Sequence, residues 1–204
     1  MAASGPPRYE LLGGRLCLDF CNTRTDRGGA GPDRFHSFAD VTGWAWRAGA
    51  LSAEEAARLT RLGTRNPTGA VAVLERARRL REALRAVFAA IAGERRVGAP
   101  GLDVLNAELA AAMARSQVVA IEGGFTWLWA PGGKALDAAL WPVARSAADL
   151  LTEGPLASLR RCENPNCDWL FLDSSRNRTR RWCDMRVCGN RAKAHRHRQT
   201  RLSA

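Results

Sequence analysis

Apolar side chains recur every three or four residues through most of the first 155 positions, and this spacing predicts a mainly helical region. The longest stripe, which includes Val73, Leu80 and Val87, predicts one helix from an N-cap at Thr68 to Ile91. Further helices are expected over residues 40–50, 52–62, 102–114 and 135–151, with one more helical turn over residues 156–161.

Three short segments have the features of strands instead. Residues 118–122 and 125–129 flank Gly123-Gly124, a two-residue turn dipeptide that predicts a hairpin. Residues 15–20 alternate between apolar and other side chains, which predicts a short strand with one buried face. The fold class expected for this part of the chain is mainly α with a few short strands (α+β).

A Gly-Pro pair at residues 154–155 marks the boundary between this helical domain and a segment of different composition. From Arg160 to Ala204 there are 12 basic and 4 acidic side chains, a net charge of +8, whereas the preceding residues carry a net charge of only +3. The 204 residues suffice for one full domain and a small module. We therefore expect a helical domain over residues 1–155 and a basic module over residues 156–204.

Four of the six cysteines lie in this module with the spacing C-x4-C, 15 residues, C-x4-C. They are Cys162, Cys167, Cys183 and Cys188, and two close pairs of thiolates joined by a connecting segment are typical of a tetrahedral zinc site. Metal binding also explains how a segment with few large apolar side chains folds, since it supplies on the order of 10 kcal/mol. Because four thiolates leave no coordination position for water, we expect one structural zinc ion and no metal catalysis.

The residues around the cysteines predict the shape of the module. An Asn-Pro-Asn sequence inside the first pair favours a tight turn. Residues 169–172 and 178–182 have strand character and are expected to form a hairpin, and a helix is expected over residues 185–199. A turn, a hairpin and a helix with ligands at both ends are similar to a treble-clef zinc finger. His195 and His197 point in different directions on that helix, so we expect exposed side chains rather than metal ligands.

The positive excess of the module is mostly arginine and favours a polyanionic partner, because the guanidinium group binds phosphate through two N–H groups. Phosphate contacts position a protein on nucleic acid, whereas side chains at base edges provide specificity. A solvated surface is the open alternative for the arginines, and a structural role beside the metal is the alternative for Gly189-Asn190-Arg191. The candidate nucleic-acid contacts are Arg176, Asn177, Arg178, Arg180, Arg181, Arg186, Asn190, Arg191, Lys193, Arg196 and Arg198.

The helical domain offers fewer candidate functional residues. Cys17 and Cys21 are expected to be buried and structural rather than a redox pair. Asp19, Asn22 and Thr23 either stabilise a loop or line a small-molecule pocket. No Walker-type phosphate loop, G-x-S-x-G or H-E-x-x-H motif occurs, so an enzyme is not expected. No apolar run approaches the roughly 20 residues of a membrane span, and we expect a cytoplasmic protein.

Two motifs resemble those of known families. The CGNR sequence at residues 188–191, after three earlier cysteines, and the segment at residues 169–183 are similar to the CGNR zinc finger. Residues 16–23, LCLDFCNT, resemble the LxLDFxNT element of the ABATE domain usually found ahead of that finger, with Cys21 where the family has an aliphatic residue. The resemblance covers nearly the whole chain and implies a bacterial stress-induced transcription regulator.

Three functional hypotheses follow from these observations. The first is a zinc-dependent DNA-binding regulator whose basic module contacts double-stranded DNA and whose helical domain senses a small-molecule effector or forms a homodimer. The second is an RNA-binding or ribosome-associated protein that uses the same module. The third is an interaction protein or enzyme in which the module only stabilises the C-terminus. Both nucleic-acid hypotheses predict binding that weakens steeply with salt, so only a comparison of DNA with RNA separates them.

Overall fold

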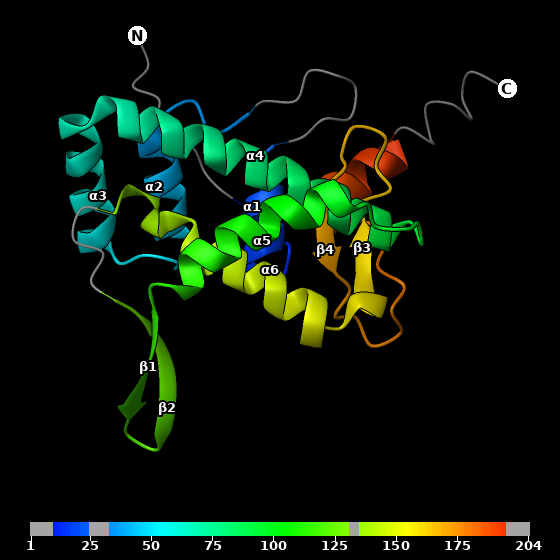
Figure 1. Cartoon of the computed structure of the whole chain (residues 1–204). Coiled ribbons are helices and arrows are strands. Elements are labelled where there is room, and N and C mark those ends of the chain that lie inside the picture. Colours follow the sequence, from blue (N-terminus) through cyan, green and yellow to red (C-terminus); the bar gives the residue numbers. More distant parts are fainter. Residues whose placement is uncertain (1–9, 25–32, 131–134, 195–204) are drawn as a thin grey trace, which may run out of the picture.

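The helix α4 (Pro67–Ala92) is the element on which most of the others pack. The computed structural model describes residues 10–24, 33–130 and 135–194. Helix α5 (Ala99–Met113) lies beside α4, and α6 (Trp141–Glu153) lies beside α5 (Figure 1). Asn66 caps α4, because its side-chain oxygen accepts a hydrogen bond from the backbone N–H of Gly69 at 3.0 Å. The predicted long helix is confirmed, but its cap is Asn66 rather than Thr68.

The remaining large helices pack around α4, and the helices expected over residues 40–50, 52–62 and 102–114 are confirmed. The helix expected over residues 135–151 is divided in two, because Pro142 has no backbone N–H with which to continue a preceding helix. None of the helices in the described residues has the length and apolarity to span a bilayer. The elements are α2 (Phe38–Arg47), α3 (Ala53–Arg65), α5 (Ala99–Met113), the 3-10 helix η1 (Leu136–Ala139) and α6 (Trp141–Glu153).

The strand expected over residues 15–20 is wrong, because the chain forms the helix α1 (Leu16–Cys21) there. Its buried positions are spaced i, i+1, i+3 and i+4, which places them on one face of a helix. The alternating pattern is misleading because Cys17 behaves as an apolar residue. Helix α1 packs on α6, where the hydroxyl oxygen of Ser146 accepts a hydrogen bond from the Cys17 N–H at 3.2 Å.

The expected hairpin is confirmed, with its turn shifted by one residue. Strand β1 (Ser116–Ile121) pairs with β2 (Gly124–Trp129) in a register that places Glu122 and Gly123 in the turn. Gly123 has φ of +82°, a conformation that glycine adopts without steric cost. The hairpin projects away from the helices (Figure 1).

The C-terminal module contains a second two-stranded antiparallel sheet. It is formed by β3 (Leu159–Arg161) and β4 (Leu170–Leu172). Of the helical turn expected over residues 156–161, only η2 (Leu156–Ser158) is helical, and the residues after it form β3. Strand β4 therefore pairs with the strand that precedes it, and the treble-clef hairpin expected with residues 178–182 is a wrong prediction.

Residues 178–182 are not in a strand because Asp173 folds the chain back after β4. Its carboxylate accepts hydrogen bonds from the backbone N–H groups of Ser175 and Arg180, at 2.9 Å each. A π-helical turn, η3 (Met185–Gly189), follows and continues as helix to residue 194. The rest of the helix expected there lies outside the described residues.

The C-terminal module packs directly on the helical part of the chain. Leu159 and Leu170 belong to the same hydrophobic core as the helices. Asn22, just after α1, pairs with both polar groups of the Leu170 backbone: its amide donates to the carbonyl at 2.8 Å, and its oxygen accepts from the N–H at 2.9 Å. Arg85 of α4 donates a further hydrogen bond to Asp168 at 2.5 Å. The domain boundary at residue 155 stays a prediction, and the two parts share one core.

Replacing Asn22 with alanine would leave both polar groups of the Leu170 backbone unpaired in a buried setting. We expect the free energy of unfolding to fall by about 2–3 kcal/mol, because each unpaired buried polar group costs about 1–3 kcal/mol. Urea denaturation measures this change. Asn177→Ala is the matched control, since Asn177 is exposed, and its effect should stay within about 0.5 kcal/mol. Equal losses in both variants would contradict the structural role of Asn22.

Candidate metal centre and basic surface

The side chains of Cys162, Cys167, Cys183 and Cys188 converge, and their sulfur atoms all lie within 4.8 Å of one another. The Sγ–Sγ distance is 3.7 Å between Cys167 and Cys183, and 3.6 Å between Cys183 and Cys188. Zinc–thiolate bonds of about 2.3 Å in a regular tetrahedron require roughly 3.8 Å between sulfur atoms. All four thiols are buried, and their arrangement fits one four-thiolate zinc ion.

Two polar side chains, Asn164 and Asp184, form hydrogen bonds that hold the cysteine pairs in place. Asn164 accepts from the N–H of Asn166 at 2.9 Å, which forms the expected turn, and its amide donates to the carbonyl of Cys188 at 3.0 Å. Asp184 begins η3, because its carboxylate accepts from the N–H of Val187 at 2.8 Å. The sequence predicted the turn at Asn164 but not its bond to Cys188 or the cap at Asp184, although an Asp three residues before a turn N–H is the usual signal for such a cap.

The close approach of the thiols shifts their acidity in opposite directions. The pKa of Cys162 is lowered because the neighbouring thiols donate hydrogen bonds to its sulfur. The pKa values of Cys167 and Cys183 are raised because these two thiols donate the hydrogen bonds and must keep their protons to do so. Bound zinc requires the thiolate form of every ligand. With four protein ligands and no open position, the ion supplies a cross-link between segments of the module.

Arg180 supports the metal centre from within the module. Its guanidinium carbon lies 4.5 Å from the ring centroid of Phe171, and its N–H groups donate to the backbone carbonyls of Trp182 and Cys183. The side chain is only partly exposed. The structure therefore replaces the predicted nucleic-acid contact at Arg180 with a structural role.

The other candidate contacts in the described residues are exposed. Arg181 is among them, although its Nε donates to the carboxylate of Glu163 at 2.6 Å. The exposed candidates are Arg176, Asn177, Arg178, Arg181, Arg186, Asn190, Arg191 and Lys193. The residues that lie outside the described part of the chain are Arg196, Arg198, His195 and His197.

The tripeptide Gly189-Asn190-Arg191 combines structural and exposed positions. Gly189 is buried, and a Cβ atom there would collide with Sδ of Met185, so a larger residue would require the half-exposed Met185 side chain to move. The Asn190 amide donates to the carbonyl of Arg186 at 2.9 Å, which holds it in the helix. The side chain of Arg191 is exposed and remains a candidate contact.

A groove of about 650 Å³ lies between the C-terminal module and the segment just before α1. Arg176 and Arg178 line it from the loop after β4, and Arg15 lines it from the other side. Within the described residues, these three guanidinium groups have no hydrogen-bond or ion-pair partner. Asp173, which also lines the groove, is buried and bonded to Ser175. The groove therefore has the charge and size to hold phosphate groups.

Among the described residues, Asp19, Asn22 and Thr23 leave no room for a small-molecule ligand. The space beside them measures about 10 Å³, roughly enough for one water molecule. Asn22 is bonded to β4, the Thr23 hydroxyl donates to the carbonyl of Phe20 at 2.7 Å, and Asp19 accepts from the N–H of Gly13 at 2.8 Å. Of the two roles expected for these side chains, the contacts fit the stabilising role, and the alternative of a small-molecule pocket is not supported.

A buried arginine organises the same region. Arg81 has no exposed surface, and its guanidinium forms a two-point ion pair with Asp33 at 2.6 and 2.8 Å. It also donates to the hydroxyl of Thr23 at 3.2 Å. Sequence reasoning missed this residue, although it lies four positions after Ala77 and three before Leu84, on the apolar face of α4.

The two thiols of α1 are buried, as predicted. Cys17 and Cys21 have no exposed surface. Burial raises the pKa of Cys17 to about 12 and raises that of Cys21 well above its ordinary value. Reactive cysteines have the opposite shift, so these two serve packing.

Two family matches agree with this architecture. Residues 14–154, more than half of the chain, match the ABATE family, described as "Putative stress-induced transcription regulator". The chain belongs to the ABATE family. Residues 158–201 match the CGNR zinc finger, so the four converging cysteines hold a single structural zinc ion. A search of curated proteins found no match. The ABATE and CGNR resemblances are confirmed, and they support a zinc-binding regulator.

Replacing Cys183 with serine removes one of the four thiolates. We expect this variant to lose its zinc, as measured by elemental mass spectrometry, and the CGNR finger to unfold while the helices retain their circular dichroism. Cys17→Ser is the matched control, because Cys17 is a buried thiol outside the site, and it should retain one zinc ion per chain. Full zinc occupancy in Cys183→Ser would contradict the ligand assignment.

Burial raises the pKa of Asp19 to about 6, compared with about 3.9 for an unfolded aspartate. A raised folded pKa means that this carboxyl stabilises the protein most below about pH 4 and that the contribution is lost as the pH rises through about 6. Asp19→Asn removes this dependence and keeps an acceptor for Gly13. We expect the melting temperature of the variant to rise relative to the wild type between about pH 4 and pH 7. A difference in melting temperature between Asp19→Asn and the wild type that does not change with pH would contradict the raised pKa of Asp19.

Proposed function

We propose that the protein is a zinc-dependent transcription regulator that binds double-stranded DNA through its CGNR finger, in the bacterial cytoplasm. The observation that carries this proposal is the groove beside the finger. There, Arg15, Arg176 and Arg178 present guanidinium groups that have no partner among the described residues. Membership of the ABATE family supports the regulatory role.

The loop that carries Arg176 and Arg178 is held by hydrogen bonds on both sides. Asp173 bonds to the backbone at its start and end, and Arg180 ties its end to the metal centre. A loop whose backbone is already held loses less conformational entropy on binding phosphate than a mobile loop does. Asn177 lies between the two arginines in the sequence and is the candidate for base-edge contacts.

DNA is favoured over RNA because the tryptophans of the finger are not free for base stacking. Trp169 is buried in the finger core, and Trp182 is half-buried with the Arg181 guanidinium 5.3 Å from its ring centroid. Readers of single-stranded RNA use exposed aromatic side chains. An RNA-binding or ribosome-associated protein is the alternative that the experiment must separate.

Enzymatic activity is not part of this proposal. The four-thiolate site has no open coordination position for a substrate. The buried thiols of α1 have raised pKa values, which is unfavourable for nucleophilic chemistry. Of the two roles considered for the helical domain, effector sensing and dimerisation, the exposed hairpin favours dimerisation.

Removing the arginines of the groove tests the proposal. In the double variant Arg176→Ala/Arg178→Ala we expect affinity for duplex DNA to fall on the order of tenfold at about 150 mM salt. The slope of log K against log salt should decrease by about 1.8, since each lost phosphate contact contributes about 0.9. Fluorescence anisotropy with labelled duplex DNA measures both quantities.

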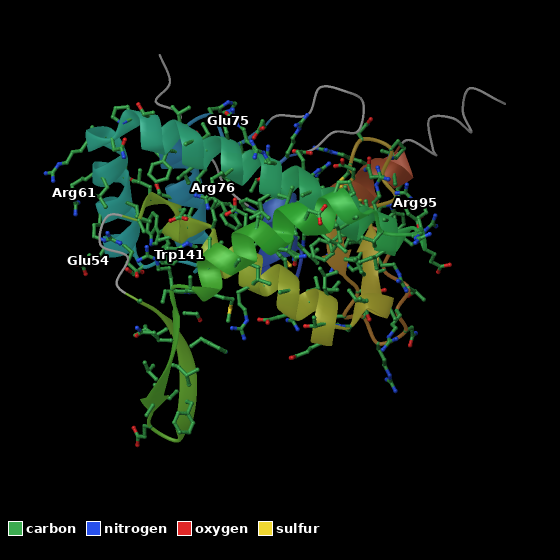
Figure 2. All side chains as sticks on the ribbon, viewed as in Figure 1. Glu54, Arg61, Glu75, Arg76, Arg95 and Trp141 are labelled. Atoms are coloured by element: carbon green, nitrogen blue, oxygen red, sulfur yellow. The ribbon has the colours of Figure 1, made fainter. Side chains whose placement is uncertain are left out.

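The matched control is Arg61→Ala/Arg65→Ala, which removes two exposed arginines from α3. Arg61 lies at the opposite end of the molecule from the finger (Figure 2), so this variant should bind DNA like the wild type. Equal losses of DNA affinity in the two double variants would mean that the total positive charge, and not the groove, determines binding, and would contradict the proposal. Displacement of bound DNA by structured RNA of similar length would support the alternative function instead.

A further inference from the structure

The β1–β2 hairpin exposes large apolar side chains that the described residues do not cover. Phe125 is 78% exposed, Val118 59% and Ile121 54%, while Trp127 and Leu128 are each 48% exposed. Over residues 116–129 the one charged side chain is Glu122. Surface strands normally carry charges or proline to prevent association, so an uncharged apolar hairpin indicates an interface.

The strand register gathers the largest of these side chains on one face. Residues directly opposite one another in an antiparallel pair point to the same side. Val118 is opposite Trp127, and Ala120 is opposite Phe125. One face of the hairpin therefore carries an aromatic and aliphatic row from the tip to the base.

The base of the hairpin is fixed to the helices, and its outer part receives no such support. Trp129 packs on Trp141 of α6 with 6.0 Å between ring centroids, and the Arg145 guanidinium lies 4.3 Å from the ring centroid of Trp127. These contacts set the direction in which the hairpin projects. Because an isolated two-stranded sheet is marginally stable in water, the tip needs a partner.

An apolar groove of about 720 Å³ lies beside the base of the hairpin. Leu51, Leu128, Trp129 and Trp141 line it, with charged side chains from α3 at its margin. Figure 2 shows Trp141 where the hairpin joins the helices. One chain thus carries both an exposed aromatic tip and an apolar groove.

We propose that the hairpin binds a second copy of this chain, so that the two hairpins lie side by side in opposite directions. In this two-fold arrangement each tip, with Phe125, reaches the groove at the partner's hairpin base. Each strand has six residues and is roughly 20 Å long, so a tip in an antiparallel pair comes level with the opposite base. The same patch then contacts itself on both copies, which closes the dimer.

The available area is consistent with a stable dimer. Val118, Phe125 and Trp127 share one face of the hairpin, and Leu128 lines the groove; together they offer on the order of 400 Å² on each copy. Two copies together bury about 800 Å², and the remaining walls of the two grooves bring the total close to the roughly 1,000 Å² expected of a specific interface. This dimer identifies the partner in the dimerisation role proposed above, and it requires no DNA.

Sedimentation velocity of the full zinc-loaded chain, without DNA, tests the inference. We expect the wild type to sediment as a dimer of 22.2 kDa chains. Val118→Lys and Phe125→Lys should each weaken self-association at least about tenfold, because they place a charge in an apolar contact. Val71→Lys is the matched control, since Val71 is also 59% exposed but lies on α4, and it should remain a dimer.

A variant outside the hairpin tests the groove. Ala50→Arg fills part of the groove and leaves both strands unchanged, so it should also weaken the dimer. Circular dichroism and zinc content must match the wild type in every variant, so that a change in sedimenting mass reports a lost interface rather than a lost fold. A wild-type monomer at about 100 μM, a concentration at which even a weak specific dimer forms, would overturn the inference. A dimer that survives all three interface substitutions would overturn it equally, whereas loss of DNA binding alone would not.

Discussion

The metal centre is the constraint on which the C-terminal module depends. The hydrophobic cluster of the finger consists of Trp169, Phe171 and the four cysteines, so most of its core residues are also metal ligands. The two strands of its sheet have three residues each. A segment with so few apolar contacts gains too little from burial to offset its conformational entropy, and four metal bonds supply what is missing.

The finger is held by the helical domain as well as by its ligands. Asp168, next to the ligand Cys167, is bonded to Arg85 of α4, and Asn22 extends the hydrogen bonding of β4 toward α1. The groove that Arg15, Arg176 and Arg178 line also has one wall from each part. The orientation of the basic surface therefore depends on the core that both parts share, and the proposed dimer would fix two such surfaces relative to each other.

Arginine has two different physical roles in this protein. Arg81 and Arg180 are turned inward, where their planar groups satisfy carboxylate, carbonyl and aromatic partners. Arg176 and Arg178 are exposed and have no partner among the described residues. Counts of basic residues locate the polyanion-binding part of the chain, but they do not separate these roles, because burial depends on contacts distant in the sequence.

The sequence by itself determined the four metal ligands, the large helices and the hairpin, because ligand spacing, helix periodicity and turn residues are local properties. Only the tertiary structure decided that residues 16–21 form a helix and that β4 pairs with β3. It also decided that Asp19, Asn22 and Thr23 bond within the polypeptide. Each of these outcomes depends on packing against α4, α6 or the metal centre, and local patterns carry no information about such distant partners.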